Sequence, residues 1–265
     1  IPPMNPLKEL DAEGVLLLTL DRPHRKNAFD EDQWDGLATA LNEARDDPRV
    51  AVVVLTGAGG NFSSGVDLSS FGGGERPPRE DGHPSGFFAC VTALFEFDKP
   101  ILAAVQGAAV GGGCTITLAC DVVYVGESVR MRLPFANLGL VPEIASSYTL
   151  QANIGRQRAA ELMFTAEWID AEKAVALGLA AHAFPDDEVL AATMAKAHEM
   201  SQWPVSALRG IKQTLQVANN AGIAAAREIE DLRMMELAGS PENIEAVRAF
   251  MEKRAPDFKQ FRKLD

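Results

Sequence analysis

The chain has 265 residues, of which 47% are hydrophobic and 23% are charged, as in an ordinary globular protein. Its formal net charge of -12 argues against nucleic acid as a partner, because phosphate binding requires concentrated lysine and arginine. The most apolar stretch, residues 101–125, contains Gln106, Asp121 and four glycines, and therefore does not fit a membrane span. The three cysteines and four histidines show no disulfide framework and no metal-ligand spacing, so we expect a cytoplasmic protein with no metal site.

The first half of the chain alternates predicted strands and helices. Residues 14–20 and 50–56 are short apolar runs rich in branched side chains, which is typical of buried strands. Between them, Asp30 can cap a helix whose apolar residues recur at helical spacing: Trp34, Leu37, Ala38, Leu41 and Ala44. Residues 101–105 and 121–125 predict two more strands, separated by a glycine-started helix over 111–119. This alternation predicts an α/β core.

The second half of the chain is dominated by predicted helices. Before it, residues 69–87 are rich in glycine and proline and lack an apolar period, which predicts a mobile loop beside a site or a plain surface loop. Beyond residue 187 the predicted helices cover 187–201, 204–217, 221–238 and 241–252. We therefore expect a core over residues 1–200 and a helical segment over 201–265.

Two glycine-bearing turns are candidate ligand sites. The sequence NFSSGVDL (61–68) follows a predicted strand, and three glycines at 111–113 precede a predicted helix. Such glycines leave backbone N–H groups bare and let a ligand approach, which suits a carbonyl oxygen that gains charge; tight helix packing is the alternative. Neither turn has the spacing of a P-loop or of a dinucleotide fingerprint, which disfavours a nicotinamide enzyme.

Five ordered motifs resemble those of the enoyl-CoA hydratase/isomerase, or crotonase, superfamily. They are RPHRKNAF (22–29), VVVLTGAGGNFSSGVDL (52–68), KPILAAVQGAAVGGGC (99–114), LPFANLGLVPE (133–143) and FTAEWIDAEKAVALGL (164–179). The resemblance implies an α/β, crotonase-like spiral of ββα units with a helical carboxy-terminal trimerisation segment, assembled as a homotrimer or homohexamer. It also implies an acyl-CoA thioester as substrate, with no cofactor beyond the CoA moiety.

The resemblance implies roles for individual residues of these motifs. The backbone N–H groups of Val66 and Gly112 would bind the thioester oxygen, and each such donor is worth about 3 to 4 kcal/mol when an enolate forms. The residues implied in holding CoA are Arg25, Lys26, Ala28, Ser64, Gly65, Asp67, Leu68 and, on the last helix, Lys253. A solvated turn is the alternative for Arg25 and Lys26, and Asp67 could instead cap or anchor its turn.

Two positions depart from the hydratases of the family, which use a glutamate at each of them. Here they are Thr115 and Phe135, and without those carboxylates the addition of water has no evident acid or base. We expect both side chains to line the pocket for the acyl chain, with ordinary core packing as the alternative.

Glu143 is the remaining candidate acid and base. By itself it could simply be a first-turn helix residue after Pro142. However, LPFANLGLVPEIASSY (133–148) resembles the peroxisomal-type enoyl-CoA delta-isomerases, in which a glutamate at this place is the sole acid and base. Apolar neighbours would raise its pKa toward the working pH. We therefore expect Glu143 to convert a 3-enoyl-CoA into the 2-enoyl-CoA.

Two other functions remain open at this stage. One is a different acyl-CoA reaction of the superfamily, catalysed by a hydratase, hydrolase or lyase. The other is an acyl-CoA binder without catalytic activity.

Overall fold

The computed structural model describes residues 5–67 and 81–262. Its main sheet has six strands in the order β1-β2-β3-β4-β6-β8, with β1 and β2 antiparallel and the other pairs parallel. These strands are β1 (Leu7–Leu10), β2 (Val15–Leu20), β3 (Val52–Gly57), β4 (Ile101–Val105), β6 (Val122–Gly126) and β8 (His182–Phe184). A second, parallel pair consists of β5 (Ala108–Val110) and β7 (Arg130–Arg132).

Ten α-helices are described, and three short 3-10 turns accompany them. The helices are α1 (Glu31–Asp46), α2 (Gly86–Glu96), α3 (Gly112–Leu118), α4 (Ser146–Ile154), α5 (Arg156–Thr165), α6 (Ala171–Leu177), α7 (Val189–Ser201), α8 (Val205–Val217), α9 (Asn220–Leu237) and α10 (Pro241–Met251). The 3-10 turns are η1 (Pro23–Arg25), η3 (Ala136–Leu138) and η4 (Lys259–Phe261). Within the described ranges, no helix combines the length and apolar character needed to cross a bilayer.

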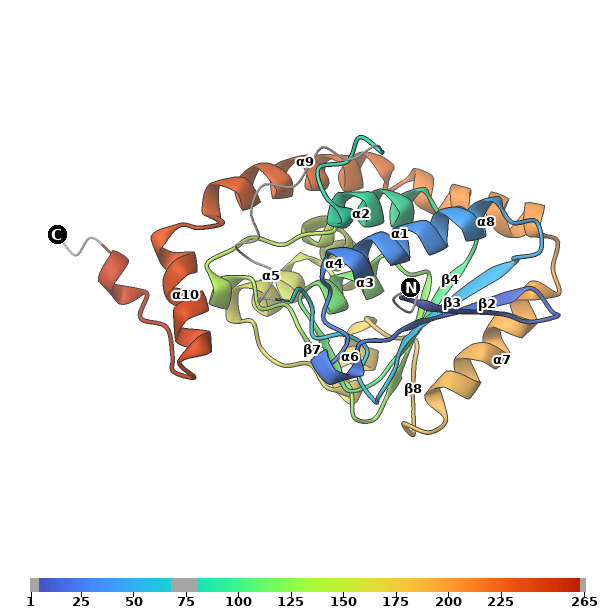
Figure 1. Cartoon of the computed structure of the whole chain (residues 1–265), viewed down its shortest axis with the longest axis horizontal. Helices are drawn as coiled ribbons and strands as arrows, with labels where there is room; N and C mark the ends of the chain where they lie inside the picture. The colour runs from blue at the N-terminus through green and yellow to red at the C-terminus, as the bar shows by residue number, and fades with distance from the viewer. Residues whose placement is uncertain (1–4, 68–80, 263–265) are drawn as a thin grey trace.

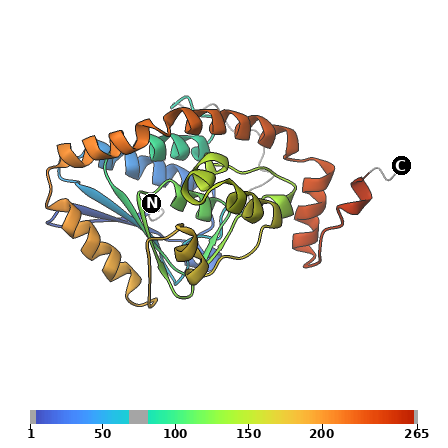
Figure 2. The same ribbon diagram turned by 180° about the vertical axis from the view of Figure 1, so that it is seen from behind.

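Apart from Thr56, the central strands β3 and β4 have no polar side chain, because helices cover both faces of the sheet. All residues of β3 and β4 are buried. Alternate residues of β3 face opposite sides: Val53 and Leu55 belong to the cluster that α1 and α2 close, whereas Val52 and Val54 belong to the cluster that α7 and α8 close. Figures 1 and 2 show α7 on the side of the sheet opposite α1 and α2.

The last helix stands apart from this layered body. In both views, α10 and residues 252–262 extend away from the end of the molecule that is opposite α7. Helix α10 packs on η3, where the Asn243 side chain donates a hydrogen bond to the Leu138 carbonyl at 2.8 Å. It begins at Pro241, as predicted, and the Ser240 side chain caps it by accepting a hydrogen bond from the Asn243 amide.

The α/β core predicted from the sequence is confirmed. The Asp30 carboxylate caps α1 by accepting the Gln33 amide at 2.9 Å, as the pattern indicated. The prediction of a loop over 69–87 is wrong at its end, because α2 already begins at Gly86; residues 68–80 lie outside the described part of the chain. A tertiary contact explains the early start, since the Gly86 amide donates to the Glu31 carboxylate at 2.5 Å. The division at residue 200 stays a prediction.

Candidate active site

The loop after β3 returns to pair with β5, and this pairing sets the position of the first glycine turn. The Ser63 amide donates to the Ala108 carbonyl at 2.8 Å, and the Val110 amide donates to the Ser63 carbonyl at 3.0 Å. On the other side of the loop, Val66 forms a parallel bridge with Phe29. The loop is therefore held between two segments, and its next residues lie beside the start of α3.

Glycine is required where these backbones meet. A Cβ atom on Gly65 would lie 2.5 Å from the Val110 carbonyl oxygen and 3.5 Å from the Gly112 nitrogen. A Cβ atom on Gly113 would lie 2.4 Å from the Ser63 carbonyl oxygen. Gly65 also has a φ of +89°, a conformation that side chains strongly disfavour. The two predicted glycine turns are thus brought into contact.

The two amides predicted to bind an oxygen are available for a ligand. Within the described part of the chain, neither the Val66 N–H nor the Gly112 N–H donates a hydrogen bond to a protein acceptor. By contrast, the flanking amides of Gly65, Asp67 and Gly111 all donate to acceptors in the chain. Adjacent unpaired backbone donors are the arrangement that stabilises a developing oxyanion.

Glu143 lies beside these donors, in the segment between η3 and α4. A Cβ atom on Gly112 would lie 3.2 Å from Glu143 Oε1 and 3.3 Å from the Trp34 ring. The Glu143 side chain is half-buried, and its pKa is raised to about 7, first by burial and second by the negative charge of Glu230. A carboxyl group with this pKa can both take and return a proton near neutral pH.

The turn that carries Glu143 has an uncommon backbone. Ile144 and Ala145 have φ values of +56° and +54°, and the left-handed region costs about 1 to 2 kcal/mol for each residue with a side chain. The Ser146 amide closes the turn on the Glu143 carbonyl at 3.0 Å. The conformation persists only because its surroundings hold it.

The predicted CoA loop meets the first glycine turn on its outer side. The Ser64 amide donates to the Lys26 carbonyl at 2.9 Å, and the Ser64 hydroxyl donates to the Arg25 carbonyl at 3.2 Å. The Arg25 and Lys26 side chains are exposed, whereas Ala28 is buried. The structure thus brings together Arg25, Lys26 and Ser64, and leaves both cationic side chains open to a ligand.

Asp67 anchors its turn through ion pairs. Its carboxylate lies 3.1 Å from Arg22, which also pairs with Asp30 at 3.0 Å. Only 10% of the Asp67 side chain is exposed, so the group is engaged within the protein. Its predicted neighbour in the CoA site, Leu68, lies outside the described residues.

The position predicted for Lys253 is wrong. The residue does not lie on the last helix, because α10 ends at Met251 and Lys253 takes a left-handed φ of +55°. The amides of Lys253 and Arg254 donate back to the carbonyls of Phe250 and Ala249, which ends the helix as a left-handed C-terminal residue does. Its contact with CoA stays a prediction.

Thr115 and Phe135 are both interior residues. Thr115 is fully buried on α3, and its hydroxyl donates to the Gly112 carbonyl at 3.3 Å. Phe135 is 5% exposed and belongs to the main apolar cluster. Their role as walls of an acyl pocket therefore stays a prediction, but neither brings a carboxylate to the site.

Sequence reasoning missed several residues that build the site. Trp34, counted only as part of a helical period, stacks on Phe29 with ring centroids 4.0 Å apart and reaches Gly112. The buried Asn27 side chain donates to the carbonyls of Ala58 and Asn61 at 2.9 and 2.7 Å. The available signal for Asn27 was its place within the RPHRKNAF motif (22–29). For Trp34, no sequence pattern distinguishes a core residue from a site residue.

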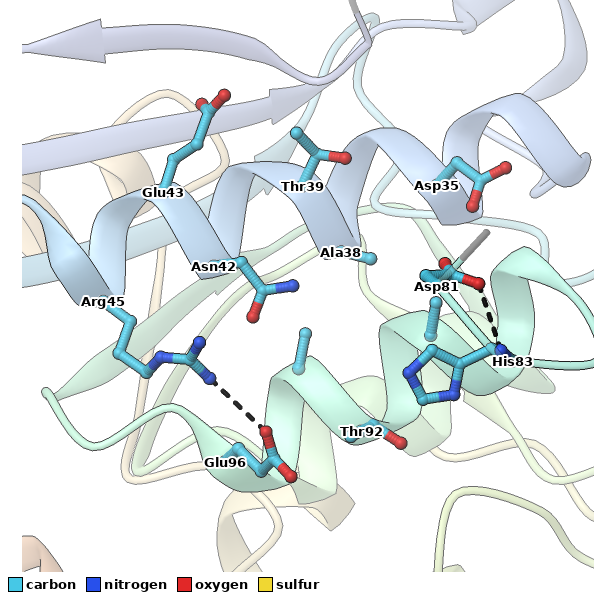
Figure 3. Close-up of a pocket in the computed structure, with 12 residues that line it drawn as sticks. Asp35, Ala38, Thr39, Asn42, Glu43, Arg45, Asp81, His83, Thr92 and Glu96 are labelled. Atoms are coloured by element: carbon cyan, nitrogen blue, oxygen red, sulfur yellow. Dashed lines mark hydrogen bonds and ion pairs between the residues drawn. The ribbon is translucent and has the colours of Figure 1, made fainter. Parts of the chain in front are cut away.

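A polar groove between α1 and α2 is separate from this site (Figure 3). Arg45 lies 3.4 Å from Glu96 across the groove, and the His83 amide donates to the Asp81 carboxylate at 3.0 Å. None of the predicted site residues lines it.

The chain belongs to the enoyl-CoA hydratase/isomerase family, whose sequence model matches residues 11–262. It is 34% identical over 251 residues to the 2,3-dehydroadipyl-CoA hydratase of Escherichia coli K12, covering 93% of this chain and 96% of that protein. It is 33% identical over 251 residues to the 1,2-epoxyphenylacetyl-CoA isomerase of the same organism, covering 93% and 95%. The crystal structure of an enoyl-CoA hydratase/isomerase from Pseudoalteromonas atlantica T6c matches with a TM-score of 0.89 and 33% identity, covering 95% of this chain and 98% of that one. The expected crotonase-like fold is confirmed.

The raised pKa of Glu143 predicts a stability effect that depends on pH. The folded value is about 7 against an ordinary 4.5, so the contribution to stability is fully present below 4.5 and is lost as pH rises to about 7. Glu143→Gln has no proton to lose. We therefore expect the difference in free energy of unfolding between Glu143→Gln and the wild type to shift in favour of the variant as pH rises across this window. Above about pH 7 the shift should be on the order of 1 to 3 kcal/mol.

Urea denaturation at about pH 4 and about pH 8 measures this difference. Glu127→Gln, which removes an exposed carboxylate, is the matched control. A difference between Glu143→Gln and wild type that is the same at both pH values would contradict the raised pKa.

Proposed function

We propose that the protein is an enoyl-CoA isomerase that converts a 3-enoyl-CoA into the 2-enoyl-CoA, with Glu143 as its single acid and base. The observation that carries the proposal is the placement of one half-buried carboxyl group, with a pKa near 7, beside two unpaired backbone amides. This is the reaction of the peroxisomal-type delta-isomerases that residues 133–148 resemble.

The reaction requires an oxygen site and one proton carrier. The thioester oxygen accepts hydrogen bonds from the amides of Val66 and Gly112, and Glu143 takes a proton from C2. The electron pair of the broken C2–H bond passes into the dienolate, whose negative charge gathers on that oxygen. Glu143 then gives the proton to C4 as the double bond forms between C2 and C3. Atoms and electrons balance without any cofactor beyond the CoA part of the substrate.

Two other acids near the site, Glu230 and Asp67, are already engaged. Glu230 accepts hydrogen bonds from two backbone amides, and Asp67 is paired with Arg22. Thr115 and Phe135 occupy the positions at which the hydratases have glutamates. Among the residues that the structure describes, Glu143 is the carboxyl group beside the two amides that remains free, and one such group suits a proton shuttle better than the addition of water, in which one group activates water and another protonates carbon.

A hydratase is the second candidate, and the relatives favour it. The Escherichia coli relative that is 34% identical to the chain is a 2,3-dehydroadipyl-CoA hydratase. In that case the substrate would be a 2-enoyl-CoA, Glu143 would activate water for attack on C3, and the product would be a 3-hydroxyacyl-CoA. Product analysis separates the two reactions, because isomerisation leaves the substrate mass unchanged and hydration adds one water.

Turnover of a 3-enoyl-CoA tests the proposed reaction. The conjugated 2-enoyl thioester absorbs in the ultraviolet, so its formation can be followed directly. We expect activity in the wild type and a loss of roughly a hundredfold or more in kcat for Glu143→Gln, because the proton carrier is removed. Glu127→Gln should keep full activity. A wild type that leaves the 3-enoyl-CoA unchanged, or a Glu143→Gln variant with normal kcat, would contradict the proposal.

The close approach at Gly65 predicts a second kinetic effect. In Gly65→Ala the new methyl group meets the Val110 carbonyl and displaces the Val66 amide, so we expect kcat to fall roughly a hundredfold. Gly60 is the matched control, since its φ of +74° is similar but nothing lies within 4 Å of an added Cβ. Gly60→Ala should therefore cost stability without reducing kcat. Equal kcat values in the two variants would show that the Val66 amide has no catalytic part.

We also propose that the chain assembles into a homotrimer or homohexamer through α9 and α10. Large apolar side chains are exposed there, including Met235 at 74% and Phe250 at 64%. An exposed apolar surface of this kind is typical of a protein interface.

Sedimentation equilibrium measures the assembly. We expect three or six times the chain mass of 28.4 kDa for the wild type. A Met235→Lys/Phe250→Lys variant should dissociate because it places charges in the apolar contact, whereas Gln202→Lys, at the exposed residue that follows α7, should not. A wild type of one chain mass would rule out the assembly.

A further inference from the structure

Glu230 is a buried acidic side chain that forms no ion pair with the described residues. It projects from α9, is 4% exposed, and its carboxylate accepts two backbone amides of the segment that starts α4. Oε2 accepts the Ala145 N–H at 2.8 Å, and Oε1 accepts the Ser147 N–H at 2.8 Å. A helix N-terminus leaves such amides without partners, and α4 has no capping side chain of its own. Glu230 supplies the cap from 83 to 85 residues away in the chain.

The capped amides belong to the strained turn that carries Glu143. Ala145 is one of its two left-handed residues, and Ser147 is the second residue of α4. Neither glycine nor asparagine, which tolerate this conformation, occupies the turn. The hydrogen bonds from Glu230 therefore fix a backbone that the local sequence does not favour.

A second contact fastens α9 to α4. The Tyr148 hydroxyl donates to the Asn219 side chain at 2.9 Å, and a Cβ atom on Gly222 would lie only 2.2 Å from the Tyr148 ring. This close packing sets the distance between the two helices. It gives the Glu230 carboxylate a fixed platform from which to hold the turn.

We propose that Glu230 is a positioning residue for Glu143: it holds the Ile144–Ala145 turn in the conformation that directs the Glu143 carboxyl group toward Gly112. The expected effect on kinetics rests on the proposed function. The role of Glu230 in holding the turn rests on the structure alone. It adds to the site a residue from the carboxy-terminal helices, which touches no substrate and acts through the backbone.

Glu230 also acts on Glu143 through its charge. It raises the pKa of Glu143. The pKa of Glu230 is itself raised, first by burial; its hydrogen bonds with Ser147 and Ala145 lower it, and the charge of Asp231 on the same helix adds a smaller rise. Two helices near the turn add no charge: neither α4 itself nor α3, which packs against it, contains Asp, Glu, Lys, Arg or His. On α5 the charged residues Arg156, Arg158 and Glu161 are exposed. Removing the charge of Glu230 should therefore lower the pKa of Glu143.

The test compares Glu230→Gln with Glu228→Gln, which makes the same change at an exposed position on α9. Hydrogen exchange of residues 143–150, followed by mass spectrometry, reports on the turn without any reaction. We expect exchange there to be at least about tenfold faster in Glu230→Gln and unchanged in Glu228→Gln, because only the former loses a cap.

Kinetics supply the second readout. For Glu230→Gln we expect kcat to fall at least about tenfold with KM changed by less than about threefold, because Glu143 moves while the CoA contacts stay. The pKa seen in the pH profile of kcat should also fall below that of the wild type. A purely structural role would not move this pKa.

The outcomes separate the two proposals. Unchanged exchange and unchanged kcat in Glu230→Gln would overturn the positioning role. If the wild type has no isomerase activity, the proposed function fails, and the exchange result alone decides whether Glu230 holds the turn. If Glu230→Gln does not fold, Glu230→Asp replaces it, since it keeps the charge but shortens the reach; wild-type exchange in Glu230→Asp would equally overturn the proposal.

Discussion

The close approach of two backbone segments is the constraint on which the candidate site depends. The loop after β3 and the start of α3 come so near each other that side chains at Gly65 and Gly113 would strike carbonyl oxygens 2.5 and 2.4 Å away, and the Glu143 side chain reaches them from the turn before α4. Because the backbones can touch, the Val66 and Gly112 amides lie together with Glu143 at their side. The sheet and the helices that cover it make this contact possible, because they fix the points at which each segment leaves the core.

The site holds several features that oppose folding. Two amides have no partner among the described residues, two residues adopt left-handed backbone, and Glu143 ionises with difficulty. Each of these features is unfavourable for stability and useful for chemistry. The unpaired amides are already in place when negative charge develops on the thioester oxygen. A carboxyl group with a pKa near 7 can both accept and return a proton. The surrounding packing, including the buried cap from Glu230, offsets their cost. Function is thus concentrated where the local sequence disagrees with the local structure.

Much of this could be predicted from the sequence, and the exceptions have physical causes. Residues 50–56 and 101–105 indicated buried strands because both faces are covered, and the glycine turns indicated backbone donors because glycine permits close approach. The strands β1, β5, β7 and β8 are three or four residues long, which is too short for a periodic pattern. Glu230 looks like any acid on an exposed helix, since its partners lie more than 80 residues away. Hydrogen bonds between residues so far apart in the chain cannot be predicted from a local sequence pattern.

The central claim is that one oxygen site and one carboxyl group act on the same thioester. The crystal structure of the protein with a bound acyl-CoA tests it most directly. The account predicts that the thioester oxygen lies about 2.7 to 3.1 Å from both the Val66 and Gly112 nitrogens, and that C2 lies about 3 to 3.5 Å from a Glu143 oxygen. A thioester oxygen bound elsewhere, or a Glu143 carboxyl group turned away from C2, would contradict it.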